Sequence, residues 1–317
     1  MTTVLITAIG GDIAQGVAAI VRECFPDWRL LGCDIHARHG GRLFVERVDL
    51  APAVSNRMYG EWLATQLRNE RVGICVPMSE VELAFVAGAP QLRALARFAM
   101  PNPRAIEVGN DKLATARFLE SIGCPAPWTM PAQEFDGEGL PCIFKPRRGA
   151  GSRGIFVCKT VEEVRFYHEH APDGIVQQLL LPAEKEVTCS VFRSRGGDTA
   201  VLQLLRTLVG GFTGWAEVIE VPEVTRQCTQ IAEALDLHGS INIQLRLTPD
   251  GPRIFEINSR FSSTVLMRHR MGFRDVVWCL EDLMGRPVSL ARPRVGMAAV
   301  RVQGAAILRD KSEDDVK

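Results

Sequence analysis

The segment Arg-Ile-Phe-Glu-Ile-Asn-Ser-Arg that ends at Arg260 constrains the fold of this chain most. It follows a Pro-Asp-Gly turn and reads as a β-strand. Because side chains alternate across a strand, Glu256, Asn258 and Arg260 should point to one face, with Phe255 and Ile257 on the other. Carboxylate and amide oxygens suit Mg²⁺, and arginine suits a phosphate or carboxylate. Taken alone, an edge strand with a solvated polar face explains the segment equally well.

A glycine-rich loop follows an apolar run that ends in Phe-Lys-Pro at Lys145. The loop, residues 147–154, precedes a second apolar run, so two strands joined by a loop are predicted. Glycine lets backbone amides approach an anion, and Lys145 would place a charge on a phosphate. The loop is not a Walker P-loop, because it lacks Gly-Lys-Ser/Thr and no helix follows. The alternative is a hairpin with a basic, mobile tip.

Residues 239–247 predict a second strand with an unusually polar face. Isoleucine and leucine alternate there with Asn242, Gln244 and Arg246. Most amphipathic strands have a solvated polar face, so this pattern alone is a weak signal. Its place one hairpin before Glu256 favours a ligand-binding face.

A helix is predicted from Asn110 or Asp111, either of which can cap it, to about Ile122. Lys112 falls in its first turn, where the helix dipole disfavours a cation. The lysine is either a solvated surface residue or is tolerated because an anion binds nearby.

These four segments, in this order, resemble the ATP-grasp superfamily of carboxylate ligases, and most closely its carbamoyl-phosphate-synthase-like and pyrrolysine-biosynthesis-type stand-alone members. The resemblance implies an α/β and α+β protein with the ATP-grasp fold. An N-terminal Rossmann-like (pre-ATP-grasp) parallel-sheet domain would precede two α+β lobes that enclose ATP. The expected domains are residues 1–100, a small ATP-binding lobe 101–181, a large lobe with the metal site 182–308, and a charged tail 309–317.

The resemblance also implies a role for individual residues. Lys145 and Arg260 would be catalytic, with Arg260 stabilising the transferred phosphoryl group. The metal ligands would be Gln244, Glu256 and Asn258. The nucleotide-binding set would be Lys112, Lys145, Gly149, Gly151, Ser152, Arg153, Gly154, Gln177, Gln178, Leu179, Leu180 and Glu186.

The activity implied by the resemblance is ATP-dependent ligation of a carboxylate to an amine or ammonia, with release of ADP and phosphate. The cofactors would be ATP and Mg²⁺, with Mn²⁺ as an alternative, and a homodimer is one expected assembly. Two other readings remain open. One is a non-catalytic nucleotide-binding partner subunit. The other, less favoured, is an NAD(P)-dependent oxidoreductase, which rests on the glycine turn of residues 10–16 and on Asp34.

Composition agrees with a soluble enzyme, which is expected to be cytoplasmic, but does not identify one. The 37 basic and 37 acidic residues cancel, and no basic stripe indicates nucleic acid. The chain shows no membrane-length apolar run and no signal-peptide pattern. Its nine cysteines are scattered and odd in number, which favours reduced thiols over a disulfide framework.

Several segments carry secondary predictions. Residues 206–215 read as a mobile hairpin over the site, with Trp215 as a contact. The basic run 268–270 either meets an anionic substrate or lies on the surface. Residues 272–285 predict a helix, and residues 297–308 a closing strand. Gly10, Gly11 and the Ser79-Glu80 turn either face the cleft or are only tight turns.

Overall fold

The structure, a computed structural model, describes residues 1–149, 154–302 and 304–307. Its first sheet has five parallel strands in the order β3-β2-β1-β4-β5. The strands are β1 (Thr3–Ile6), β2 (Arg29–Asp34), β3 (Arg47–Leu50), β4 (Val72–Val76) and β5 (Arg97–Phe98), accompanied by helices α1 (Asp12–Cys24), α2 (Tyr59–Asn69), α3 (Glu80–Ala87) and α4 (Pro90–Arg93) and by the short turn η1 (Gly40–Leu43). Strands that alternate with helices give the predicted parallel sheet.

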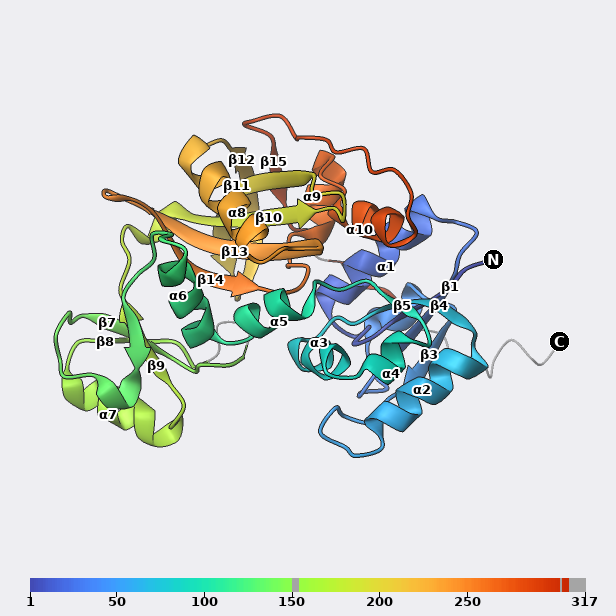
Figure 1. The fold of residues 1–317 in the computed structure, drawn as a ribbon, viewed down its shortest axis with the longest axis horizontal. Helices are drawn as coiled ribbons and strands as arrows, with labels where there is room; N and C mark the ends of the chain where they lie inside the picture. Colours follow the sequence, from blue (N-terminus) through green and yellow to red (C-terminus); the bar gives the residue numbers. More distant parts are fainter. Residues whose placement is uncertain (150–153, 303, 308–317) are drawn as a thin grey trace.

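The second sheet has four antiparallel strands in the order β6-β9-β7-β8. They are β6 (Thr129–Pro131), β7 (Cys142–Lys145), β8 (Phe156–Cys158) and β9 (Ile175–Gln178), with helix α7 (Val161–His170) and the turn η2 (Ala132–Glu134). In Figure 1 this small lobe lies at the lower left, away from the parallel sheet.

The third sheet has six antiparallel strands in the order β14-β13-β10-β11-β12-β15. They are β10 (Glu186–Arg193), β11 (Thr199–Val209), β12 (Phe212–Ile219), β13 (Gly239–Thr248), β14 (Gly251–Asn258) and β15 (Ala298–Val300). The helices are α5 (Pro103–Gly109), α6 (Lys112–Ser121), α8 (Pro222–Ala234), α9 (Val265–Met271) and α10 (Asp275–Leu283), and the turn η3 (Ala183–Lys185) precedes β10.

The strands of the three sheets fall within residues 1–100, 101–181 and 182–308, respectively. The domain boundaries themselves stay a prediction. Helices α5 and α6 fall within the predicted small lobe but pack on the six-stranded sheet. Their residues Ala105, Val108, Phe118 and Leu119 belong to the core of that sheet. Gly109 at the end of α5 explains how closely they approach. A Cβ there would lie 2.9 Å from the backbone nitrogen of Ser259.

One continuous hydrophobic core joins the parallel sheet to the six-stranded sheet. Helix α1 packs against α9 and α10, and buried residues of β11 and β12 complete the cluster. Gly16 permits the contact between α1 and α9, since a Cβ there would lie 2.8 Å from the Val265 side chain. The small lobe has a separate core around Phe144 and Val176. Burial of apolar surface is the main driving force for each cluster.

Two predictions about the C-terminal third need correction. The helix expected from residue 272 begins at Asp275, because Gly272 has a φ of +105° and ends α9. The expected closing strand is short and spans only Ala298–Val300 among the described residues. The tail 309–317 lies outside the described residues.

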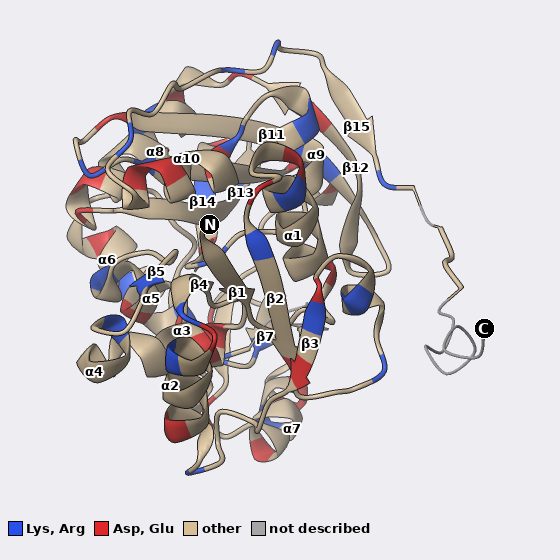
Figure 2. Cartoon of the chain, turned by 90° about the vertical axis from the view of Figure 1, so that its right-hand side faces the viewer, with Lys and Arg blue, Asp and Glu red and all other residues tan. Residues whose placement is uncertain are grey.

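The described helices and the charges visible in Figure 2 bear on the partners of the protein. Among the described helices, none combines the length and apolarity needed to cross a bilayer. Figure 2 shows basic and acidic residues interspersed over the elements of the view that it presents. This mixture matches the net charge of zero.

Arg268 holds α9 to α10 and does not face a ligand. Its guanidinium donates to both carboxylate oxygens of Asp275 at 2.8 Å, and both side chains are 1% exposed. Ser240 donates to the same carboxylate at 2.6 Å. Two alternatives were open for Arg268, contact with an anionic substrate or a surface position. Its burial contradicts the second, and its pairing with Asp275 accounts for the charge without a substrate. His269 is buried as well, and Arg270 pairs with Glu23.

We expect Asp275→Ala to lower the free energy of unfolding by about 3–5 kcal/mol, because it leaves the Arg268 charge buried and unpaired. Denaturant unfolding would measure the loss. The matched control is Arg226→Ala, which breaks an exposed ion pair with Glu223 and should cost at most about 1 kcal/mol. Equal losses in the two variants would contradict a special role for the buried pair.

Candidate functional site

Two adjoining cavities lie between the small lobe and the six-stranded sheet. The larger, of about 620 Å³, is lined by Asp12, Ile13, Lys112, Lys145, Pro146, Arg148, Gly149, Ile155, Arg206, Leu208, Gly211, Phe212, Gln244, Glu256, Asn258, Arg260, Ser262 and Ser263. The smaller, of about 180 Å³, is lined by Ile143, Lys145, Ile155, Gln177, Gln178, Leu180, Glu186, Arg206, Leu208, Gln244, Arg246, Phe255 and Glu256. They share six residues and therefore form one site.

Most of the residues predicted from sequence meet here. The larger cavity contains Lys112, Lys145, Gly149, Gln244, Glu256, Asn258 and Arg260, and the smaller adds Gln177, Gln178, Leu180 and Glu186. Leu179 and Gly154 line neither cavity. Gly151, Ser152 and Arg153 lie outside the described residues.

The paired strands β13 and β14 present the predicted metal ligands together. Gln244 lies opposite Glu256, and Asn242 lies opposite Asn258. One carboxylate and two amides supply oxygen donors, which is the set that Mg²⁺ takes when phosphates complete its coordination. Within the described residues there is no cluster of three His, Cys, Asp or Glu side chains of the kind that alone holds a metal. The donor set at Glu256 thus fits a hard cation bound together with a phosphate ligand.

A β-bulge changes the face on which Phe255 lies. The register shifts between Gln244 and Leu245, so that Glu256 pairs with Gln244 while Ile254 pairs with Leu245. The unpaired Phe255 therefore turns to the cavity side, next to Glu256. The prediction from simple alternation, which put Phe255 on the opposite face, is wrong because a bulge inserts one extra residue into the strand.

Lys145 is a buried cation in the wall that both cavities share. Its side chain is 4% exposed, and its ammonium donates to Gln177 Oε1 at 2.8 Å. Burial lowers the pKa of Lys145 to about 8, attraction to Glu256 opposes that shift, and repulsion from Lys112 adds to it. The ammonium also lies 5.7 Å from the centre of the Phe255 ring. An anion in the cavity would offset the cost of burying this charge.

The base of the glycine-rich loop is fixed to the start of α6. Asp111 caps the helix by accepting from the backbone of Leu113 and Ala114, and its carboxylate also accepts two hydrogen bonds of 2.8 Å from Arg147. The ammonium of Lys112 donates to the carbonyl of Gly149 at 2.8 Å. These contacts hold Lys112 at the cavity wall and bear out Asp111 as the helix cap.

Glu186 lies between Arg206 and Arg246. The strand pattern placed Arg246 on the polar face that favours ligand binding, but neither arginine was given a role in the site. Arg206 donates to Glu186 Oε1 at 3.0 and 2.6 Å, and Arg246 pairs with Glu186 Oε2. Arg206 lines both cavities, and Arg246 also lies over the Phe255 ring. Alternation along β11 could have indicated Arg206, which was noted only as the start of a hairpin.

The parallel-sheet domain contributes to the site through α1 and α3. Asp12 and Ile13 line the larger cavity, and Glu80 accepts a 3.1 Å hydrogen bond from Arg260. Gly10 does not line it. Its backbone nitrogen instead donates to Asp34 at 2.9 Å, so this part of the glycine turn and its acid stabilise each other.

The hairpin of β11 and β12 covers part of the cavity, as predicted, but through different residues. Leu208, Gly211 and Phe212 line the cavity. Trp215 is 47% exposed and lines neither cavity, so its predicted contact with the site is wrong. Trp215 instead lies opposite Val300 where β12 pairs with β15.

Comparison with known proteins identifies the fold. Residues 109–264 match the ATP-grasp domain. A D-alanine–D-alanine ligase of Thermotoga petrophila is 36% identical over 95 residues, 27% of this chain and 30% of that protein. The Mycobacterium bovis enzyme of the same name is 28% identical over 204 residues, 53% of this chain and 54% of that protein.

Among solved structures, an ADP complex of N5-carboxyaminoimidazole ribonucleotide synthetase has a TM-score of 0.74 at 15% identity, over 94% of this chain and 80% of that one. The regions that match this chain span about a third and about half of the length of the two D-alanine–D-alanine ligases. The sequence match and the shared fold together establish that this protein contains an ATP-grasp domain, preceded by a parallel-sheet domain.

Proposed function

We propose that this protein is an ATP-dependent ligase that activates a carboxylate as an acyl phosphate and joins it to an amine or ammonia. One observation carries the proposal: Lys112, Lys145 and Arg260 line the same cavity as Glu256 and Asn258. Cations that neutralise phosphates and oxygen donors that suit Mg²⁺ thus meet where the two lobes face each other. The ATP-grasp ligases to which the chain is similar support this assignment.

The two cavities suggest how ATP would lie. The smaller has apolar walls from Ile143, Leu180 and Phe255, which suit the adenine ring. Glu186 lies in the same cavity and would face the ribose. The phosphates would extend into the larger cavity, toward Lys112 and Lys145. The predicted nucleotide set stays a proposal in full, including Leu179 and Gly154, which line neither cavity.

We propose Gln244, Glu256 and Asn258 as the residues that hold Mg²⁺, with Mn²⁺ as an alternative. The cation would neutralise charge on the phosphates. The Asn258 amide is 4% exposed, and its side-chain nitrogen has no hydrogen-bond partner among the described residues. A buried N–H donor without a partner is costly, and a phosphate oxygen beside the cation would accept from it while the amide oxygen faces the metal.

The chemistry follows from the charges that the chain supplies. A carboxylate oxygen of the substrate attacks the γ-phosphorus of ATP, and the bond to the bridging oxygen breaks to release ADP. The amine then attacks the acyl carbon, phosphate leaves, and the amine loses a proton. Phosphoryl transfer needs positioning and charge neutralisation rather than a nucleophile from the protein. Lys145 and Arg260 would supply both, and Glu80 would orient Arg260.

We also propose a cytoplasmic location and a homodimer. The nine free cysteines, eight of them buried, support the cytoplasmic location. Two of them, Cys142 and Cys158, lie directly opposite each other in neighbouring strands without a disulfide. The homodimer rests only on the resemblance to ATP-grasp ligases.

The function can be tested before its substrates are known, because hydroxylamine traps acyl phosphates as hydroxamates. We expect the wild-type protein, given Mg·ATP and hydroxylamine, to release ADP with at least one compound from a panel of amino acids, dicarboxylates and hydroxy acids. Glu256→Gln keeps the shape of the side chain but removes its charge. It should lower the rate of ADP release by about 10²-fold or more. Nucleotide binding without ADP release over the whole panel would favour a non-catalytic nucleotide-binding subunit.

The buried ammonium of Lys145 predicts a pH dependence of nucleotide binding. Because its pKa is about 8, the charge that meets the phosphates is present at pH 7 and mostly lost at pH 9. The Kd for Mg·ATP measured by calorimetry should therefore rise about tenfold over this range. Lys145→Met should bind weakly at both pH values and lose the dependence. A wild-type Kd that is constant from pH 7 to pH 9 would contradict the assignment.

The same group has the opposite effect on folding. Between pH 8 and the ordinary value of 10.5, the unfolded chain keeps the Lys145 proton while the folded protein has released it. This lysine therefore makes the ligand-free protein more stable as pH rises through that window.

A further inference from the structure

A third cavity, of about 620 Å³, lies on a different side of the parallel-sheet domain. Its wall runs from α4 and β5 through the segment that follows β5 to the β10–β11 turn. It is lined by Val72, Gly73, Arg93, Ala94, Leu95, Ala96, Arg97, Phe98, Met100, Pro101, Asn102, Pro103, Arg195, His238 and Leu283. None of these residues lines either of the two cavities of the candidate active site.

The charges around this cavity have one sign. Arg93, Arg97 and Arg195 line it together with His238, and no Asp or Glu is among the described residues of its wall. The guanidinium of Arg195 lies 3.9 Å from Asp282, which lines the adjoining inner cavity and partly compensates this charge. Like charges around one cavity repel one another. A bound anion would reduce this repulsion and accept charge-assisted hydrogen bonds from the guanidinium groups.

Apolar side chains also line the cavity, among them Leu95, Phe98, Met100 and Leu283. A ligand that contacts both the arginines and these side chains carries negative charges and an apolar body. Most small-molecule sites combine an apolar lining with a few convergent polar groups in this way.

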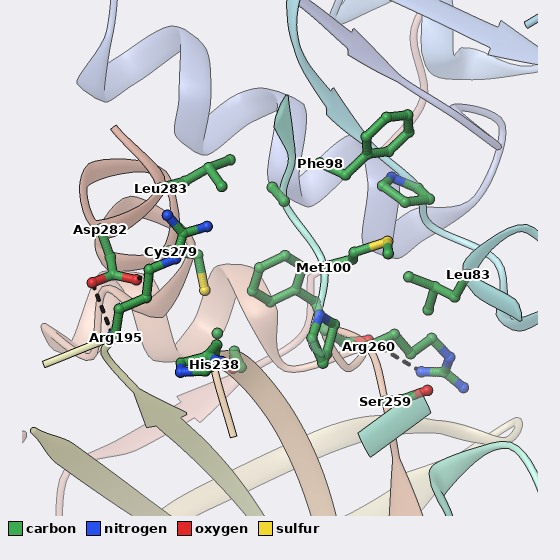
Figure 3. Close-up of a pocket in the computed structure, with 16 residues that line it drawn as sticks. Leu83, Phe98, Met100, Arg195, His238, Ser259, Arg260, Cys279, Asp282 and Leu283 are labelled. Carbon is green, nitrogen blue, oxygen red and sulfur yellow. Dashed lines mark hydrogen bonds and ion pairs between the residues drawn. The ribbon is translucent and has the colours of Figure 1, made fainter. Parts of the chain in front are cut away.

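An inner cavity of about 40 Å³ connects this groove with the catalytic strand. The two share Phe98, Met100, Pro101, Arg195, His238 and Leu283, and the far wall of the inner cavity includes Ser259, Arg260 and Phe261. Figure 3 shows Met100 between Phe98 and Arg260, with His238, Cys279 and Asp282 across the cavity. Arg260 also lines the candidate active site, so this side chain lies between the inner cavity and that site.

We propose that this groove binds a small organic anion with two or more negative charges and an apolar body, and that its occupancy is coupled to the nucleotide site through Met100 and Arg260. Arg93 and Arg97 hold the charges. A phosphate ester and a dicarboxylate present the same chemistry here.

The test is a calorimetric titration of the full chain at constant ionic strength. The probes are phenyl phosphate and phthalate, which distinguish the two ligand sources, and benzyl alcohol is the neutral control. We expect saturable binding of at least one dianion and none of the alcohol. The double variant Arg93→Gln/Arg97→Gln should raise its Kd about tenfold or more, which corresponds to ~1.4 kcal/mol.

Two further variants locate the binding. Arg117→Gln removes an exposed arginine of α6 that lines none of these cavities and should leave the Kd unchanged. Lys145→Ala should also leave the Kd of the dianion unchanged. Weaker binding in this variant would show that the dianion occupies the nucleotide site. The site is overturned if neither dianion binds, if the double variant binds as well as wild type, or if Lys145→Ala abolishes binding.

Coupling is measured with the non-hydrolysable analogue Mg·AMPPNP. The bound dianion should change the affinity for this analogue, and the analogue should change the affinity for the dianion by the same factor, since coupling between two sites is reciprocal. Equal nucleotide affinity with and without saturating dianion would overturn the coupling.

Discussion

The register between β13 and β14 is the constraint on which the site depends. It puts Gln244 opposite Glu256 and Asn242 opposite Asn258. If β14 slipped by one residue, Glu256 and Asn258 would turn into the core and Ile257 would turn into the cavity. The other face of these strands is apolar and buried, with at most 1% of each side chain exposed at Ile241, Ile243, Ile254 and Ile257. Burial of this apolar surface fixes the register.

The fold and most of the site were predictable from the sequence because their signals are local. Proline and glycine end the helix near residue 123, and Asp111 caps it as its side-chain chemistry predicts. Alternation located the polar faces of β13 and β14, the strands that carry the proposed metal ligands. The ATP-grasp assignment required four such segments in order, and the match of residues 109–264 to that domain confirms it.

What the sequence could not indicate depends on contacts between distant segments. Phe255 reaches the cavity through a bulge, and periodicity alone does not reveal a bulge. Arg268 looks like a surface cation until Asp275 and Ser240 are seen to enclose it. Arg206 and Arg246 become site residues only because neighbouring strands place both of them beside Glu186.

The continuous core between the parallel sheet and the six-stranded sheet has a mechanical consequence. Gly16 and Val265 pack closely where the two parts meet, so shared apolar packing holds these parts together. The four-stranded sheet has its own core, which is separate from that shared packing. A hinge motion of the small lobe would therefore leave the shared core intact. It would carry Lys145, on β7, relative to Glu256, on β14, and approach of these opposite charges would favour closure.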